Sequence, residues 1–417
     1  MNRLSLLLIV CVAAAPVGAA DPPPPLAEKF LHDGRFADGE TASLLALDAA
    51  PADDEARFGL GVIQFARAVE NLGRALHEYG AVSQKATQPF LRLPVPANAD
   101  PSSISYKSLG RVLDAFAADL GRAEATLAGV KDDNVKLRLR LAKVTFDFAV
   151  VGKRRTTQRL GPRLADADPP NGRTTLLDLM NKLNGGRFDF QKADPDFRVH
   201  FDRGDVAWLR AYCHLLSAMA EGYRAVDEEA GFDQRMKDIF PRVEAPAGKA
   251  DPDWVGGLKV VDAPRLRRMR LHLVAVCELN RETWAHIRKE TDDDHEWLPH
   301  AKQTDRLGLP LNDERIDAWL VMMAQFEELL KGERLLSGEL LSWVHRDHPK
   351  SQGLNLKKLL DDPVADLLSQ ARLRKEGIDA KYLEATKGRK VFNLDAVSAV
   401  FQMFNGPFGF AYAARFN

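Results

Sequence analysis

The longest apolar pattern of the chain lies between residues 204 and 229. Its polar residues recur every three or four positions, so they fall on one stripe of a helix whose other faces are apolar. A helix that is hydrophobic on most sides must be surrounded by other elements, so we expect this one to be central. Asp205 is its expected N-cap, because a carboxylate there can accept hydrogen bonds from the free amides of the first turn. The polar stripe includes Arg210, His214, Ser217, Glu221 and Arg224.

Helical spacing of apolar residues also covers 106–130 and 265–290. Asn312 is expected to cap a further helix that ends at Lys331 and Gly332. Shorter helices are expected at 173–183, 333–346, 354–361, 363–373 and 393–404.

Two segments carry strand-like alternation. Residues 135–148 include VKLRLRL, which alternates like a strand, but the Asp-Asp-Asn before it is typical of a helix cap, and we predict a helix. Residues 187–201 alternate aromatic and charged side chains around Ala193-Asp194-Pro195, which indicates one short β-hairpin. The predicted fold class is therefore all-α, an irregular helical bundle or array with at most this hairpin.

The first twenty residues are typical of a secretory signal peptide. A single positive charge at Arg3 precedes an apolar run from Leu4 to Ala15, and small residues end at Ala20. We therefore expect an exported protein, periplasmic or secreted, with a leader of bacterial type. No later segment is apolar enough for an integral membrane helix, because the central one carries charges that are costly at bilayer depth.

Residues 24–80 alternate small residues, where two helices could cross closely, with large residues that could fill the space between them. Leu60-Gly61 and Gly73 continue this pattern. It resembles about one and a half degenerate tetratricopeptide repeats over residues 24–80, although Ser43 stands where that family prefers a large aromatic. The resemblance implies paired antiparallel helices and a peptide-binding surface, and too few repeats for an independent solenoid. The residues that carry the first repeat are Leu26, Ala27, Phe30, Gly34, Phe36, Gly39, Ala46 and Pro51.

Composition narrows the functional classes. Fifty-eight basic against fifty-nine acidic residues argue against a nucleic-acid partner selected by bulk charge. Of three cysteines, Cys11 lies in the leader, and the remaining Cys213 and Cys277 allow one disulfide in an exported protein. The prolines of 88–103 predict a connector between repeat-like hairpins at 21–87 and a helical body at 104–417.

The best concentration of catalytic residue types lies between 284 and 300. His286, Asp294, His295 and His300 are types that bind metals and carry protons. The spacing does not follow a zincin motif, because the second histidine comes five residues after His295 and behind Pro299. The alternative interpretation is a solvated acidic helix end. The chain shows no Walker loop, no nucleophile elbow and no dinucleotide-binding glycine pattern, so no cofactor is expected.

Three functions remain open from the sequence. The first is a noncatalytic scaffold that binds a protein or peptide partner in the cell envelope, which the repeat-like start favours. The second is a metal-assisted hydrolase that uses the histidines and carboxylates of 284–300. The third is a small-ligand binder whose site follows the polar stripe of the central helix. We expect the first, a protein that works by binding, and the sequence leaves open whether it also has enzymatic activity.

Overall fold

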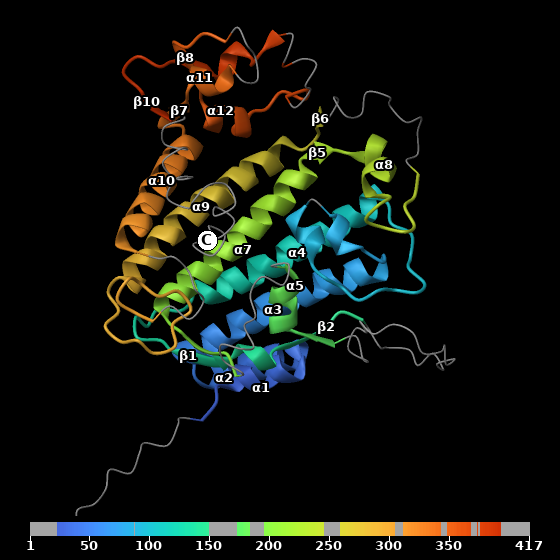
Figure 1. The fold of residues 1–417 in the computed structure, drawn as a ribbon, viewed down its shortest axis with the longest axis vertical. Coiled ribbons are helices and arrows are strands. Elements are labelled where there is room, and N and C mark those ends of the chain that lie inside the picture. Colours follow the sequence, from blue (N-terminus) through green and yellow to red (C-terminus); the bar gives the residue numbers. More distant parts are fainter. Residues whose placement is uncertain are drawn as a thin grey trace, which may run out of the picture.

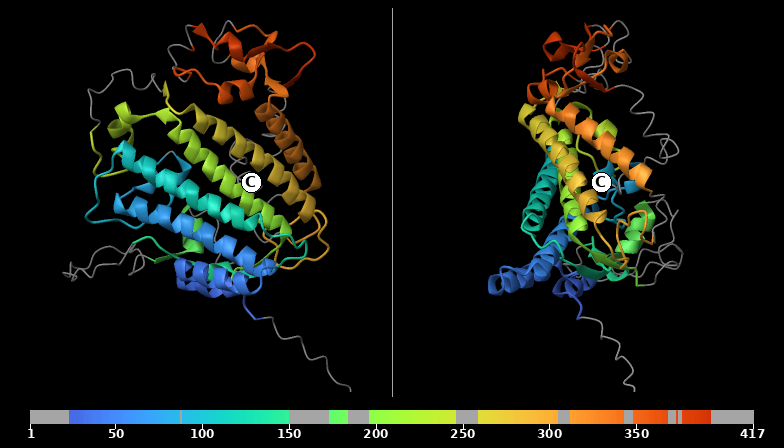
Figure 2. Two further views of the ribbon diagram at one scale, coloured as in Figure 1. Left: turned by 180° about the vertical axis from the view of Figure 1, so that it is seen from behind. Right: turned by 90° about the vertical axis from the view of Figure 1, so that its left-hand side faces the viewer.

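Five long helices, of 19 to 25 residues each, lie side by side in one layer in a computed structural model of the chain (Figures 1 and 2). The structure describes residues 23–86, 88–149, 173–183, 196–245, 259–304, 312–342, 348–367, 373 and 376–392. The predicted signal peptide lies outside these ranges. The helices of the layer, in spatial order, are α3 (Asp54–Glu78), α4 (Tyr106–Leu127), α7 (Arg203–Arg224), α9 (Ala263–Ile287) and α10 (Asp313–Lys331).

Neighbouring helices of the layer run antiparallel. Arg203, at the start of α7, bonds to Glu282 near the end of α9, whereas Arg265, at the start of α9, bonds to Glu221 near the end of α7. The predicted central helix is thus the middle one, packed between α4 and α9. A single cluster of buried apolar residues extends from Ala27 to Tyr382, so the helices and the segments at both ends of the layer share one core.

The start of α7 differs from the sequence prediction. The N-cap is Asp202, whose side chain accepts hydrogen bonds from the amides of Gly204 and Asp205. Asp205 is the third residue of the helix, and its carboxylate accepts from the amide of Asp202. The two aspartates therefore form a capping box, which satisfies free amides on both sides of the helix start. The predicted cap was wrong by three positions, because an aspartate suits both the N-cap and the third helical position of a capping box.

Other helix ends follow the prediction. Asn312 caps α10 by accepting from the amide of Arg315. Gly332 ends the same helix with φ of 74°, the left-handed conformation that glycine adopts without a side-chain penalty.

Paired helices α1 (Leu26–Asp33) and α2 (Phe36–Ala49) cover one end of the layer (Figure 1). The glycines at 61 and 73, which the repeat pattern places at two successive helix crossings, both lie within the uninterrupted helix α3. There they receive Leu127 and Phe148, since a Cβ atom at either glycine would lie 2.5 Å or less from those side chains. The resemblance to tetratricopeptide repeats stays a prediction.

Residues 135–148 form strands, so the predicted helix there is wrong. The segment contains β1 (Leu137–Arg140), the 3-10 turn η3 (Leu141–Lys143) and β2 (Thr145–Asp147). β1 pairs antiparallel with β4 (Arg198–Phe201), and β2 pairs antiparallel with β3 (Arg173–Thr175). The leucines of β1 are buried and its arginines half-buried, so the Leu-Arg alternation matched the two faces of a strand.

The predicted hairpin at 187–201 is replaced, in its described part, by this pairing of β4 with β1. Its first arm and its turn lie outside the described residues. The helix predicted at 173–183 is α5 (Leu176–Leu183), preceded by β3.

A small sheet lies at the end of the layer opposite to α1 and α2 (Figure 1). Its order is β10-β7-β8-β9, and short helices accompany it where longer ones were predicted. The fold is therefore mainly helical rather than all-α. The helix predicted at 393–404 lies outside the described residues. The elements are β7 (Arg334–Leu336), α11 (Gly338–Leu341), β8 (Gln352–Leu354), α12 (Leu356–Asp361), η5 (Ala380–Tyr382), β9 (Leu383–Ala385) and β10 (Lys390–Phe392).

Short elements connect the long ones. After α3 come η1 (Ser83–Lys85) and η2 (Pro89–Arg92), and after α7 come β5 (Val226–Asp227), η4 (Glu229–Gly231) and α8 (Phe232–Met236). β6 (Lys259–Val260) pairs with β5 and leads into α9. Across the described part of the chain, none of the helices has the length and apolar character needed to span a bilayer.

Candidate metal centre

The loop after α9, residues 288–304, packs against the end of β4 and the start of α7. The amide of His200 on β4 donates to the carbonyl of His295 in this loop, at 3.0 Å. The contact holds the loop beside the strand, so that side chains about ninety residues apart in sequence meet there.

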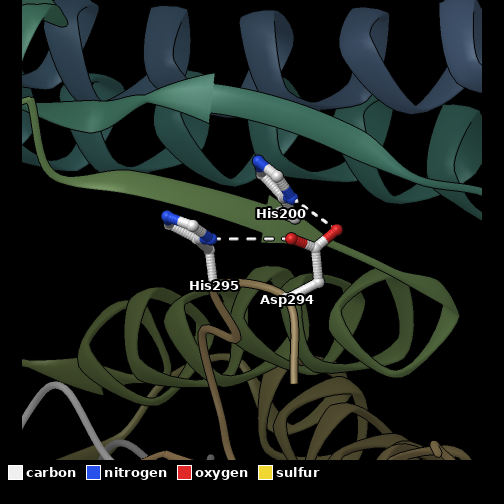
Figure 3. Close-up of side chains that lie close together, drawn as sticks. All are labelled: His200, Asp294 and His295. Atoms are coloured by element: carbon white, nitrogen blue, oxygen red, sulfur yellow. Dashed lines mark ion pairs between the residues drawn. The ribbon is translucent and has the colours of Figure 1, made fainter. Parts of the chain in front are cut away.

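His200, Asp294 and His295 form one cluster at this contact (Figure 3). Nδ1 of His200 lies 2.9 Å from Oδ2 of Asp294, and Nδ1 of His295 lies 3.5 Å from Oδ1. The two imidazole rings stack with centroids 5.0 Å apart and planes inclined by 22°. Each residue offers one possible ligand atom, and these three atoms all lie within 4.8 Å of one another.

The His200 ring is buried, and its nitrogens have no well-aligned hydrogen-bond partner among the described residues. The residue is 7% exposed. Nδ1 is close to Asp294, but close contact without the alignment of a hydrogen bond is weak for a neutral donor. Burial lowers the pKa of His200, and the neighbouring Asp294 opposes that shift. The ring is thus favoured in its neutral form, the form that binds metals.

His295 adopts an unusual backbone conformation, with φ of 64°. Such a conformation costs a residue with a side chain roughly 1–2 kcal/mol, although histidine tolerates it better than most. Strain of this kind often accompanies functional sites. Here it accompanies the turn that places the His295 ring over that of His200.

Asp294 is the more exposed member of the cluster, with 40% of its side chain accessible. Burial would raise its pKa, but the contacts with His200 and the charge of Lys136 outweigh that effect and lower it. Lys136 Nζ lies 3.8 Å from Asp294 and forms an ion pair with Asp292. The cluster therefore opens to solvent on the side of Asp294.

Three carboxylates form a second group beside the first. Oxygen atoms of Asp202, Glu290 and Glu296 also lie within 4.8 Å of one another. Asp202 is two residues after His200, and Glu296 is two residues after Asp294, whose amide donates to Glu296 Oε1 at 2.9 Å. The same strand end and the same loop therefore build both groups.

The carboxylates of this second group repel one another. Burial, followed by the neighbouring carboxylate of Asp202, raises the pKa of Glu290 to about 10. Burial raises the pKa of Glu296 to about 7. Asp205, which is fully buried near Asp202 and Glu296, has its pKa raised well above the ordinary value for the same reason. These acids favour either a shared proton or a bound cation.

The structure brings together two of the four metal-ligating residues predicted from sequence. Asp294 and His295 belong to the first group, whereas His286 and His300 belong to neither. His286 is in the last turn of α9, and the ring of His300 accepts a hydrogen bond from the amide of Lys302. The sequence prediction missed His200 and Asp202, which lie directly before the central helix. Their His-x-Asp spacing could have indicated them, because alternate residues of an extended segment point to one side.

The predicted ligand-binding stripe of α7 contacts the neighbouring helices. Arg210 bonds to Glu124 of α4, and His214 Nδ1 lies 2.8 Å from His272 Nδ1 of α9. Glu221 accepts from Arg265 and Arg268 of α9, Arg224 pairs with Asp114 of α4, and Ser217 is buried. These contacts make the stripe a polar seam that fixes the order of α4, α7 and α9.

Both remaining cysteines are free thiols, in place of the disulfide that the sequence allowed. Cys213 on α7 is close to Glu124 and Arg210, on the side of α4, whereas Cys277 on α9 is close to Glu327 and Arg281, on the side of α10. The two thiols therefore face different helix pairs, although α7 and α9 are neighbours.

Comparison of the chain with family models, with curated proteins and with solved structures found no match.

Proposed function

We propose that this protein binds a divalent transition-metal ion of the zinc class between His200, Asp294 and His295. The observation that carries the proposal is the buried His200 ring: its Nε2 has no hydrogen-bond partner among the described residues, and its Nδ1 lies 2.9 Å from a carboxylate oxygen of Asp294. Ligand atoms about 2.0–2.1 Å from a tetrahedral zinc ion lie about 3.3 Å from one another. The nitrogens of His200 and His295 lie 2.9 Å from Oδ2 and 3.5 Å from Oδ1 of Asp294, respectively, which is close to that separation.

The ligand set also supports the choice of metal. Two imidazoles and one carboxylate are the donors of many zinc enzymes, and harder cations prefer sets made of oxygen alone. Three protein ligands leave a coordination position for water, and such positions occur at catalytic zinc sites. The exposure of Asp294 and the nearby cation of Lys136 allow an anionic or carbonyl substrate to approach. The reaction class that this arrangement favours is metal-assisted hydrolysis.

Metal content tests the binding part of the proposal. The tag-free protein is dialysed against zinc, and the bound metal is measured by plasma mass spectrometry and by calorimetric titration. We expect one strongly bound zinc per chain, and affinity lower by at least about 100-fold in His200→Ala and in His295→Ala. His286→Ala and His300→Ala are matched controls from the same region and should bind zinc as the native protein does. Equal binding by all four variants contradicts the proposal.

Hydrolysis is tested separately. The zinc-loaded protein is assayed with p-nitrophenyl acetate and p-nitrophenyl phosphate, with the His200→Ala variant as the inactive control. Turnover that depends on zinc and is lost in the variant supports a hydrolase. Zinc binding without turnover of either ester leaves the site as a structural or metal-carrying one.

A second function, the peptide-binding scaffold, is supported by a different observation. Leu44 and Leu45 of α2 are 52% and 67% exposed, and Leu26 of α1 is 45% exposed. Adjacent exposed leucines on a paired helix are suited to an apolar partner surface. Leu44→Glu combined with Leu45→Glu should abolish capture of an envelope protein if this function is correct, and unchanged capture would exclude these leucines as the binding surface.

A further inference from the structure

A second place for a cation lies beside the histidine cluster, in the carboxylate group of Asp202, Glu290 and Glu296. Its oxygens all lie within 4.8 Å of one another. Oxygens on opposite sides of one calcium-sized ion, each about 2.4 Å from it, lie about 4.8 Å apart, so these separations are within the span of one ligand shell. The group is held by the capped start of α7, the residues just after α9 and the loop beyond them.

The described basic side chains near these acids pair with other carboxylates, although the charge of Lys136 opposes the effect of burial on the pKa of Glu296. Within the described ranges, none of Asp202, Asp205, Glu290 and Glu296 has a lysine or arginine in ion-pair contact. Arg203, the nearest basic residue in sequence to Asp202, pairs with Glu282. Lys136 pairs with Asp292 and reaches toward Asp294 instead. Burying ionised carboxylates without a basic partner lowers the stability of the fold, unless a proton or a metal ion supplies the positive charge.

Unsatisfied oxygens provide an independent observation. Asp205 is 3% exposed, and its Oδ2 accepts from the amide of Asp202, which holds this carboxylate against the group. Its other oxygen, Oδ1, has no hydrogen-bond partner among the described residues, and neither has Oε1 of Glu290. Buried polar atoms are almost always paired, so two orphaned oxygens beside three further carboxylates indicate a missing cationic ligand.

From these observations we infer that Asp202, Glu290 and Glu296 bind a hard divalent cation such as Mn²⁺, Ca²⁺ or Mg²⁺, with Asp205 as the buried acid behind them. The donor set consists of oxygen only, which selects this class of ion over zinc. The inference stands on the carboxylates and does not require the histidine site. If both sites are filled, two metal ions of different class lie on adjacent parts of the same strand end and loop.

The test uses the full chain and Mn²⁺, whose bound and free forms are separated by electron paramagnetic resonance. We expect one Mn²⁺ per chain, in the presence or absence of zinc. The double variant Glu290→Gln with Glu296→Gln should lower Mn²⁺ affinity by at least about 100-fold and leave zinc binding intact. His200→Ala should lose zinc and keep Mn²⁺, which distinguishes failure of one site from failure of the other. Asp292→Asn, in the same loop but paired with Lys136, is the matched control and should bind both ions.

A thermal unfolding measurement guards against a variant that fails to fold. Burial keeps the pKa values of both glutamates high, so in the absence of metal they carry only part of their charge at pH 7. The double variant should therefore melt no lower than the metal-free native protein, and it should gain nothing from Mn²⁺. The inference is overturned if Mn²⁺ does not bind the native chain. It is also overturned if Mn²⁺ binds the double variant equally well, or if His200→Ala removes both ions together.

Discussion

The amide of His200 donates to the carbonyl of His295, and the two imidazole rings stack above this bond. One backbone contact therefore sets the separation between the strand before the central helix and the loop after the next long helix. Asp202 lies two residues after His200, and Asp294 and Glu296 flank His295. The same backbone contact therefore brings both groups of ligand atoms side by side.

The turn at His295 should respond differently to glycine and to alanine. Both substitutions remove the imidazole, but only glycine adopts φ of 64° without a side-chain penalty. We expect His295→Gly to be more stable than His295→Ala by about 1 kcal/mol in metal-free buffer. Urea unfolding of the two variants measures the difference, and equal stability would show that the turn relaxes when the ring is removed.

The cap of the central helix is expected to be Asp202 rather than Asp205. Asp202→Ala removes the acceptor for the amides of Gly204 and Asp205 and should cost about 1–2 kcal/mol of unfolding free energy. Asp202→Asn keeps an acceptor oxygen and should recover most of that loss. Chemical denaturation in the presence of a chelator separates this effect from metal binding. A loss as large in the asparagine variant as in the alanine variant would contradict the capping role.

The polar seam between α4 and α7 should make stability depend on pH. The contact with His214, whose Nε2 lies 3.7 Å from the carboxylate, is opposed by burial and helped by Arg210, and it lowers the pKa of Glu124 from 4.5 to about 2. A carboxylate whose folded pKa is lowered stabilises the fold above its unfolded pKa, and the contribution disappears as pH falls toward the folded value.

Glu124→Gln should therefore be less stable than the native protein at pH 7, by about 1–3 kcal/mol. The difference should shrink between about pH 4.5 and pH 2. Unfolding curves recorded across this range measure it. A difference that is constant with pH would mean that the charge of Glu124 does not contribute.

The two cysteines should be unreactive in the folded protein. Burial raises the pKa of the Cys277 thiol to about 12 and that of Cys213 further still, so neither forms the thiolate that attacks disulfide reagents. Ellman's reagent should detect neither thiol in the native protein and both after denaturation without reductant. Absence of these thiols in the denatured, unreduced protein would reveal the disulfide that the structure does not contain.

The helices were predictable because each has a local signal. Asn312 and Gly332 mark the start and the end of α10 in the sequence as they do in the structure. The apolar residues of 106–127 recur with the spacing of a helix. The strand at 137–140 was not predictable in this way, because its alternation competed with a helix-cap pattern and was decided by pairing with β4 sixty residues later. Asp294 and His295 were recognised by residue type, but His200 was not, since only the folded loop brings it to them.

Zinc K-edge absorption spectroscopy of the zinc-loaded protein tests directly whether His200 and His295 bind zinc, because it reports the ligands of the ion itself. We expect one zinc with two imidazole ligands, whose nearest ligand atoms are nitrogen and oxygen only, at about 2.0–2.1 Å. In His200→Ala the imidazole scattering should fall to one ligand or the zinc should be lost, and in His300→Ala the spectrum should be unchanged. A spectrum without imidazole scattering, or one that changes in His300→Ala and not in His200→Ala, would contradict this expectation.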